Sequence, residues 1–307
     1  MKILLAGASG FLGKNFLELA PKEIEITGIY NKSRDIEKFV KDKNLKNVSL
    51  HKCDLTDTNS VKNLFKKIGR DFEYCIYLAA NVNVPLSVEN PAEDMNTTVM
   101  GLINFLQNCN KIKRFVYMSS AAVYDGNKGI VNVNTNLNPV VPYCISKLTA
   151  ERYVNFFHSI GKIKEYVIIR FGGAFGKYSE KKFMTSLVND IYVKNKKEIA
   201  VYGDGTNIIN IMYAKDAVKA LLKCLDSGKS NIITNLGQEN MTITETVERV
   251  AKIFNRKVRI AYTPKIKNQK YIGFRIKVDF NENFSFNPVY SFEKGIKEFG
   301  NLLKNGN

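Results

Sequence analysis

The chain has 307 residues, of which 45% are hydrophobic and 24% charged, with a formal net charge of +17 at pH 7. These values are typical of a globular protein with a sizeable core, and no apolar run approaches the roughly 20 residues that cross a bilayer. The lysines are spread along the chain without an aromatic and basic RNA-binding motif, which favours anionic small molecules over nucleic acid or a membrane as partners.

Cysteines and histidines argue against a disulfide framework and against a metal site. The five cysteines are odd in number, widely spaced and without a CxxC motif, which predicts reduced thiols in a cytoplasmic protein. His51 and His158 are too few and too separated in sequence to indicate zinc. The apolar opening MKILLAG breaks at Gly7 without a cleavage site, so it predicts a buried strand and not a secretory signal.

Short apolar runs alternate with amphipathic segments from the N-terminus to about residue 172. KILLAG, EIEITGIY, YCIYLAA, RFVYMSS and EYVIIRF predict strands, and the segments between them predict helices. This alternation predicts right-handed βαβ units, and hence an α/β fold with a Rossmann-like doubly wound parallel sheet over residues 1–172.

Beyond residue 172 the alternation is less regular. A lysine-rich helix is expected over 181–197, followed by a VYGDG turn, a helix near 214–226 and a last helix from about 291. These elements predict a smaller C-terminal α/β substrate-binding lobe over 173–307, from which about 205–235 returns to the first domain. A ligand cleft would lie between the two, at the carboxyl ends of the strands.

A glycine-rich turn joins the first strand to the first helix. Gly7, Gly10 and Gly13 would let the backbone turn tightly and approach a pyrophosphate, with Phe11 and Leu12 beside it at the helix N-terminus. Such a turn can also be merely structural, but the strand before it and the helix after it favour a dinucleotide site.

The end of the second expected strand bears on the choice of dinucleotide. EIEITGIY is followed by Asn31, Lys32, Ser33 and Arg34, with no carboxylate to accept hydrogen bonds from the ribose of NAD. Lys32 and Arg34 can neutralise a 2′-phosphate, which slightly favours NADP over NAD. The alternative is that both are solvated loop charges.

The segment VVPYCISKLTA, residues 140–150, places Tyr143 four residues before Lys147. Four other Tyr/Lys pairs in the chain have the same spacing, so the spacing alone identifies nothing. Pro142 is a good first helical residue, and one helical turn places the tyrosine and the lysine on the same face. Ser120 ends an expected strand earlier in the chain, which distinguishes this pair from the others.

The motifs together resemble those of the extended short-chain dehydrogenase/reductase family over nearly the whole chain. They are GASGFLG (7–13), CDLTD (53–57), YLAA (77–80), SSAAVY (119–124), the Tyr143/Lys147 pair, RFGGAFG (170–176) and VYGDGTNIINIMYAKDAV (201–218). Most members with this layout act on nucleotide-linked sugars as epimerases, dehydratases or reductases.

This resemblance implies a role for each of three residues. Tyr143 would remove or return a hydroxyl proton as hydride moves to or from the cofactor, and Ser120 would hold the reacting oxygen while Ser119 faces the other side of the strand. Lys147, together with an oxidised nicotinamide, would lower the pKa of Tyr143.

The same resemblance implies further cofactor residues. Asp54 and Leu55 would contact adenine, Ala79 and Ala80 would line the cofactor groove, and Asn96 would brace the fold near the active site. Each has a structural alternative: Asp54 can cap the following helix, and the alanines can simply pack.

The reaction type is narrowed by the positions after Ser120. The sugar 4,6-dehydratases of the family carry an Asp-Glu pair there, whereas this chain has Ala121 and Ala122, which argues against elimination. SSAAVY slightly favours a 4-epimerase. The absence of an Asp or Glu after the second expected strand, where it would bind the ribose of NAD, instead favours an NADPH-dependent 4-keto sugar-nucleotide reductase. A non-catalytic dinucleotide-binding sensor or assembly subunit is a third alternative, which the presence of all three catalytic residues argues against.

The substrate residues depart from the family pattern. Gly173 replaces the asparagine of RFGGAFG, and Ile209 and Asn210 replace an arginine and an aspartate. A substrate diphosphate would then need another cation, for which Lys270, Arg275 or a backbone amide cluster are candidates. The helices TTVMGLINFLQNC and YCISKLTAERYVNFFHSI are apolar enough to pair in a homodimer.

Overall fold

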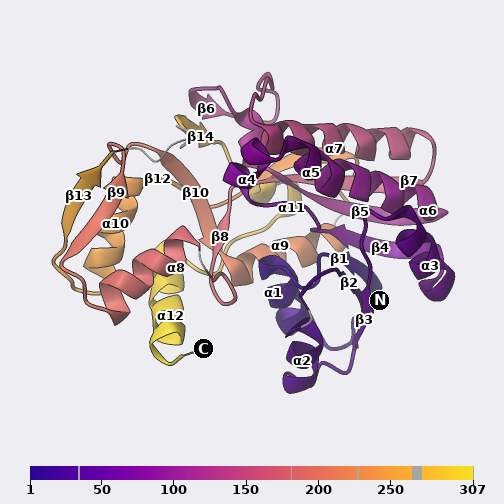
Figure 1. Ribbon diagram of the computed structural model, residues 1–307, viewed down its shortest axis with the longest axis horizontal. Coiled ribbons are helices and arrows are strands. Elements are labelled where there is room, and N and C mark those ends of the chain that lie inside the picture. Colours follow the sequence, from indigo (N-terminus) through magenta and orange to yellow (C-terminus); the bar gives the residue numbers. More distant parts are fainter. Residues whose placement is uncertain (34, 181, 227, 265–271, 307) are drawn as a thin grey trace.

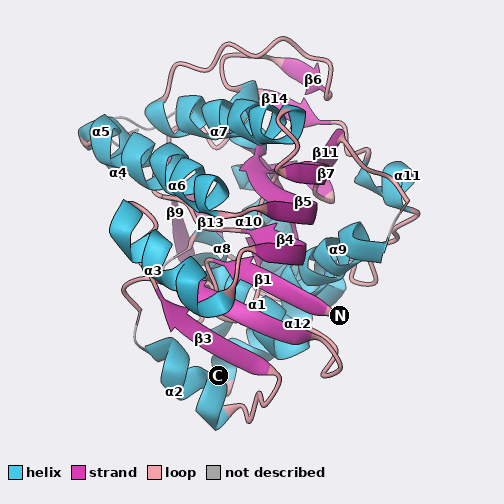
Figure 2. Cartoon of the chain, turned by 90° about the vertical axis from the view of Figure 1, so that its right-hand side faces the viewer, coloured by secondary structure: helices cyan, strands magenta, loops and turns pink. Residues whose placement is uncertain are grey.

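A computed structural model describes residues 1–33, 35–180, 182–226, 228–264 and 272–306. A parallel seven-stranded sheet with helices on both faces lies beside a smaller body of short strands and helices (Figure 1 and Figure 2). The prediction of a Rossmann-like doubly wound α/β fold is confirmed. No helix among the described residues is both long and apolar enough to cross a membrane.

The order of strands in the large sheet reverses at its first strand. In spatial order the strands are β3 (Val48–Lys52), β2 (Glu25–Tyr30), β1 (Lys2–Ala6), β4 (Asp71–Tyr77), β5 (Lys111–Ser120), β7 (Ile163–Phe171) and β11 (Ile232–Leu236). Ala6 pairs with Ile29 on one side and with Tyr77 on the other, so three strands end at the same level. This reversal opens a crevice at the carboxyl ends, where ligands bind in such sheets.

Both faces of the sheet are covered because its buried strands are apolar on both sides. Ile3 and Leu5 belong to one core, and the alternate residues Leu4 and Ala6 belong to the other. The first core contains α1 (Phe11–Leu19), α2 (Asp35–Asp42), α9 (Ala214–Asp226) and α11 (Phe280–Phe284). The second contains α3 (Thr58–Ile68), η1 (Asn96–Met100), α6 (Gly101–Asn108) and α7 (Pro142–Ser159), with α4 (Val84–Glu89) and α5 (Pro91–Met95) packed against α7.

The smaller body has a core of its own, around Phe175, Leu187 and Phe292. Its strands are β8 (Ala174–Phe175), β9 (Glu198–Tyr202), β10 (Ile208–Tyr213), β12 (Glu239–Thr242) and β13 (Arg259–Thr263). Its helices are α8 (Phe183–Val188), η3 (Asn189–Val193), α10 (Ile243–Ile253) and α12 (Phe292–Lys304). The chain returns to the large sheet through α9 and β11 between two visits to this body (Figure 1).

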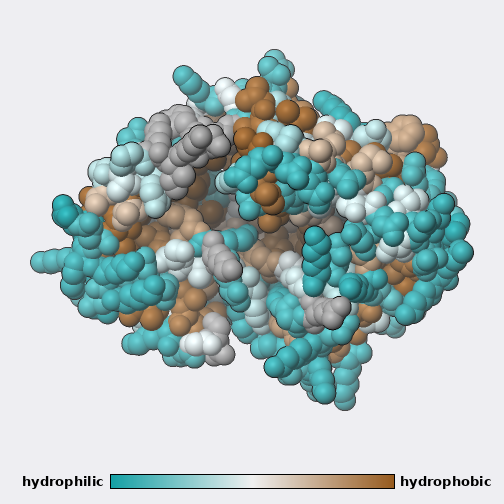
Figure 3. All heavy atoms as spheres, in the orientation of Figure 1, coloured by the Kyte–Doolittle hydropathy of each residue, from teal (hydrophilic) through white to brown (hydrophobic). Residues whose placement is uncertain are grey.

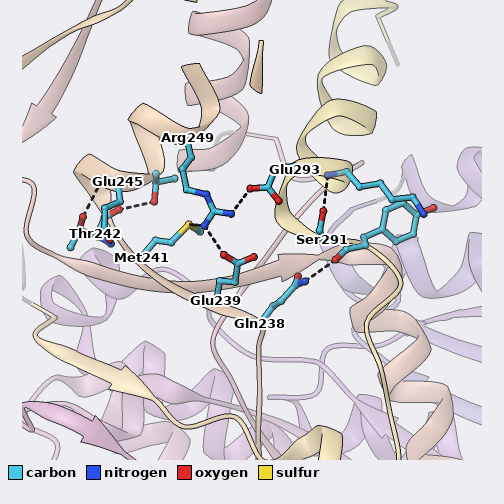
Figure 4. Close-up of polar contacts among 11 residues, drawn as sticks. Gln238, Glu239, Met241, Thr242, Glu245, Arg249, Ser291 and Glu293 are labelled. Atoms are coloured by element: carbon cyan, nitrogen blue, oxygen red, sulfur yellow. Dashed lines mark hydrogen bonds and ion pairs between the residues drawn. The ribbon is translucent and has the colours of Figure 1, made fainter. Parts of the chain in front are cut away.

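Polar contacts tie α10 and α12 to the edge strand β12 (Figure 4). Arg249 on α10 binds the carboxylates of Glu239 and Glu293, which come from β12 and α12. Thr242 and Glu245 form a capping box that satisfies backbone N–H groups at the start of α10. These contacts fix the outer helices of the small body independently of the large sheet.

One short strand lies in a segment for which the sequence analysis predicted no strand. Within residues 127–140, β6 (Gly129–Val131) pairs in parallel with β14 (Phe274–Ile276), and η2 (Ala121–Tyr124) packs beneath them. The pairing joins segments more than a hundred residues apart, so no local pattern could reveal it.

A buried polar network holds α7 against the large sheet. Glu151 of α7 and Arg170 of β7 form an ion pair at 2.9 Å, and both side chains are almost fully buried. Ser119 donates a hydrogen bond to Glu151 at 2.5 Å, and Arg170 donates one to the hydroxyl of Tyr124 at 3.1 Å. Tyr124 in turn donates to Asn235 of β11 at 2.8 Å. A buried charge pair of this kind tolerates the loss of one partner poorly, because the other charge is left unpaired.

We therefore expect Arg170→Met to lower the free energy of unfolding by about 3–5 kcal/mol, since it leaves the Glu151 carboxylate buried and unpaired. Urea denaturation followed by circular dichroism measures the change. Arg152→Met, an exposed position on the same helix, is the control and should change stability by no more than about 0.5 kcal/mol. Equal effects of the two substitutions would contradict the stabilising role of the ion pair.

Candidate active site

A cavity of about 830 Å³ opens at the carboxyl ends of the large sheet. It is lined by the glycine loop, by the ends of β2, β4, β5 and β7, by α7, and by the segment that leads into the smaller body. On the face shown in Figure 3, hydrophilic residues cover most of the outer surface. Hydrophobic residues are visible inside the hollow between the two bodies. The size and position are those of a ligand site in a doubly wound fold.

The glycine loop has a shape that side chains would destroy. Gly7 has φ +88°, and a Cβ atom there would lie 2.9 Å from the amide nitrogen of Ala79. A Cβ atom on Gly13 would lie 2.3 Å from the carbonyl oxygen of Gly7. Gly10 precedes α1 without a capping side chain, so the first-turn N–H groups beside Phe11 and Leu12 face the cavity edge. This cradle fits a pyrophosphate at a helix N-terminus.

The end of the cavity where adenosine was predicted to bind is bordered by residues that follow β2 and β3. Asn31, Lys32, Asp54 and Leu55 all line it, whereas Arg34 lies outside the described residues. Burial raises the pKa of Asp54, but hydrogen bonds from the amide and hydroxyl of Thr56 and from Asn31 outweigh this effect. The pKa of Asp54 therefore lies below its ordinary value, which favours an acceptor at this position.

A carboxylate at this end of the cavity was missed in the sequence. Asp35 begins α2 and lines the cavity, where it forms a salt bridge with Lys14 at 2.5 Å. An acid was sought only at the tip of β2, whereas Asp35 is the first residue of the following helix and still reaches the site.

The three predicted catalytic residues lie together in the cavity wall. Tyr143 forms a hydrogen bond with Ser120, and its backbone N–H donates to the hydroxyl of Ser87 at 3.2 Å. Lys147 donates to the carbonyl oxygen of Met118 at 2.9 Å. The hydroxyl of Ser119 donates to Glu151, one turn beyond Lys147 on α7, whereas Ser120 is the member of this pair that bonds to the tyrosine.

The pKa of Tyr143 is raised in the structure, whereas the sequence analysis expected Lys147 to lower it. Burial raises the pKa of Tyr143 to about 12, although the hydrogen bond with Ser120 opposes the increase. Burial also lowers the pKa of Lys147 to about 8, against the fields of Glu151 and Asp94, which raise it. Desolvation thus outweighs the expected lowering of the tyrosine pKa, so ionisation of Tyr143 would need additional positive charge nearby.

Two other predicted residues lie away from the cavity. Asn96 in η1 does not line it, whereas Glu93 and Thr97, four residues apart on one helical face, do. One residue along a helix turns the side chain by about 100°, which explains the difference. Arg275 is exposed on β14 and also does not line the cavity, and Lys270 lies outside the described residues. Ala79, Ala80 and Gly173 line it as predicted.

The segment after β8 adds cavity residues that no sequence motif indicated. Tyr178, Glu180 and Lys182 all line the cavity from the side of the smaller body. The ammonium of Lys182 lies 4.5 Å from the ring centroid of Phe11, next to the glycine loop. In a chain with so many lysines nothing but the fold distinguishes this one.

Comparison with known proteins assigns these features to a family. The model of the NAD dependent epimerase/dehydratase family matches residues 3–237, which contain the glycine loop, Ser120, Tyr143 and Lys147. The chain belongs to this family. It is an enzyme of the short-chain dehydrogenase/reductase type, as the motifs predicted.

Individual relatives are similar over their full length. A putative UDP-glucose 4-epimerase of Methanocaldococcus jannaschii is 28% identical, and the alignment covers 99% of each chain. The UDP-glucose 4-epimerase of Thermotoga maritima, solved with UDP-glucose, has a TM-score of 0.84 at 22% identity over 100% of this chain and 99% of the other. The UDP-glucuronic acid 4-epimerase of Bacillus cereus, solved with UDP-glucuronic acid and NAD, has a TM-score of 0.85 at 20% identity over 100% of both chains.

Proposed function

We propose that this member of the epimerase/dehydratase family is a nucleotide-sugar 4-epimerase. The observation that carries the proposal is the meeting of Ser120, Tyr143 and Lys147 in one cavity with a glycine loop shaped for a pyrophosphate. The named activities of the similar proteins, including a putative UDP-glucose 4-epimerase, support the same reaction and a nucleotide-linked sugar as substrate.

The proposed reaction assigns one task to each residue. A nicotinamide cofactor, which the glycine loop would hold, would supply the acceptor for the C4 hydride of the sugar and the donor that returns it to the other face. Tyr143 removes the C4 hydroxyl proton through its phenolic oxygen and returns it at the end, while Ser120 binds the same sugar oxygen. Lys147, whose pKa is about 8, is mainly protonated at neutral pH and stabilises the phenolate by its charge.

Elimination of water is disfavoured by the two residues after Ser120. A 4,6-dehydratase needs one group to protonate the leaving hydroxyl and another to remove a carbon-bound proton, at positions that carry a carboxylate pair in such enzymes. Here the positions are Ala121 and Ala122 in η2, and methyl groups transfer no protons. The structure thus favours oxidation and reduction at one carbon over dehydration.

The function is tested with Tyr143→Phe. We expect interconversion of C4 epimers among UDP-linked hexoses and hexuronates to fall by about 10²–10⁴-fold, because the acid/base group is lost. Dinucleotide binding should be retained. Tyr153→Phe, on the same helix but outside the cavity lining, is the control and should keep full activity. Full activity of the Tyr143 variant would refute the proposed role.

The cofactor preference is the second part of the proposal. The rim near β2 carries Lys14 and Lys32, while the one carboxylate there that forms a salt bridge, Asp35, is held by Lys14. We therefore propose that Lys32 favours the 2′-phosphate of NADP. The same positive rim supports the second candidate function, an NADPH-dependent 4-keto sugar-nucleotide reductase. Against this stands the NAD in the solved structure of a similar 4-epimerase.

Purification without added nucleotide, followed by denaturation and chromatography of the released dinucleotide, separates these possibilities. We expect a bound dinucleotide that survives purification, because an epimerase regenerates its cofactor in each cycle, and we expect it to be NADP. Release of NAD would refute the role of Lys32 but leave the epimerase intact. A protein that is empty, and that consumes one NADPH per turnover, would instead identify the reductase.

We also propose a homodimer formed through η1, α6 and α7. These neighbouring helical segments expose large apolar side chains, with Met100 42%, Ile145 38% and Phe156 49% accessible. Ile145 and Phe156 are eleven residues apart, which places them on one face of α7. An exposed apolar face of this kind is typical of a buried interface in a symmetric oligomer.

Phe156→Glu should convert the dimer to a monomer, because the carboxylate would be buried without a partner at the interface. Sedimentation equilibrium measures the molecular mass. Val289→Glu, at a similarly exposed position between α11 and α12, is the control and should leave the mass unchanged. A wild-type protein that is monomeric would contradict the proposal directly.

A further inference from the structure

A buried carboxylate that the proposed reaction does not use lies behind the catalytic pair. Asp94 on α5 is fully buried, and one of its oxygens accepts a hydrogen bond from the amide of Asn81 at 2.8 Å. Its other oxygen has no hydrogen-bond partner in the part of the chain that the structure describes. Burial of a carboxylate costs several kcal/mol unless charges or donors compensate, so its position calls for a physical reason.

Other buried polar side chains near α7 also lack a hydrogen-bond partner among the described residues. Thr98 follows Asp94 by one helical turn, and its hydroxyl also lacks a partner among the described residues, as do those of Tyr117, Ser146 and Tyr77. The ammonium of Lys147 lies 5.2 Å from the ring centroid of Tyr117. Both α5 and η1 pack against α7, so Asp94 and Thr98 lie on helices that contact the one carrying Tyr143 and Lys147.

We propose that Asp94 is the buried counter-charge that keeps Lys147 in its ammonium form and thereby sets the pH range in which Tyr143 works. Asp94 acts through Lys147 and does not line the cavity, so it is a positioning residue and not a catalytic one. The consequence for Tyr143 rests on the proposed function, whereas the effect on Lys147 depends only on the fold.

The other charges around the pair do not replace this role. Glu151 on α7 also raises the pKa of Lys147, and more than Asp94 does, but its carboxylate is shared with Arg170 in a 2.9 Å ion pair. Glu89 on α4 and Glu93 on α5 are exposed, and η1 contains no ionisable side chain. Among the neutral groups, burial raises the pKa values of Cys144, Tyr117 and Tyr77, which keeps them protonated near pH 7. Asp94 is bonded to a neutral amide, so its charge is available to the lysine.

The sign of the effect is the same for both members of the pair. A negative charge stabilises the ammonium of Lys147 and destabilises the phenolate of Tyr143, so Asp94 raises the pKa values of both. Burial alone would lower the pKa of Lys147 further below its value of about 8 and leave less ammonium at neutral pH. Removal of the charge should therefore shift both ionisations to lower pH.

Asp94→Asn, which keeps the size and removes the charge, tests the inference. In protein labelled with ¹³C at the lysine Cε, with the resonance assigned by Lys147→Arg, we expect the pKa of Lys147 to be lower than in the wild type by on the order of one unit. Both limbs of the pH dependence of kcat/KM should move to lower pH by a similar amount. Glu89→Gln, an exposed acid on α4, is the matched control and should move neither.

An unchanged pKa of Lys147 in the Asp94 variant would overturn the inference, as would lower activity at every pH without a shift of the limbs. A shifted pKa in a protein without epimerase activity would instead refute the proposed function and leave the inference standing. If the variant does not fold, the ¹³C titration of the Asp94 carboxyl in the wild type decides. The inference requires an ionised carboxylate from pH 6 to 9, and a protonated one would overturn it.

Discussion

The site and the packing of α7 depend on a row of buried ionisable side chains along this helix. Tyr143, Lys147 and Glu151 are each four residues apart, so they lie on one face of the helix, and that face is buried against β5 and β7. Two ionisable groups can be buried there only because the sheet offers matched partners. Arg170 neutralises Glu151, and the carbonyl oxygen of Met118 accepts from Lys147. The packing that stabilises α7 is therefore also what orients the tyrosine.

The same burial sets the chemistry. Removal from water makes the phenol of Tyr143 harder to ionise and the ammonium of Lys147 easier to deprotonate, which is the opposite of what an acid/base pair needs. Fixed charges must correct both effects, and they act unequally. Glu151 and Asp94 help the lysine keep its proton, while the hydrogen bond with Ser120 and any nearby positive charge help the tyrosine lose one.

The fold and the centre of the site could be predicted because their signals are local. The glycine loop, the serine at the end of β5 and the tyrosine and lysine on α7 each follow from a few neighbouring residues. The parts that were missed depend on contacts across the chain. Asp35 reaches the cavity through its salt bridge with Lys14, and Lys182 reaches it because the smaller body folds over the glycine loop. Asn96 does not line the cavity whereas its neighbour Thr97 does, because the local sequence does not reveal which side of this helical segment faces the site.

The departures from the family pattern have a structural explanation that bears on the substrate. Asn210 is buried between the two bodies, where its side chain accepts from the amide of Gln238, and a Cβ atom on Gly172 or Gly237 would collide with it. Ile209 packs against the core of the smaller body. These positions serve packing, so they supply no cation to a substrate diphosphate. Lys182 is the described lysine that lines the cavity from the side of the smaller body, and its ammonium lies next to Phe11 at the glycine loop, so the positive charge on that side of the cavity is its own.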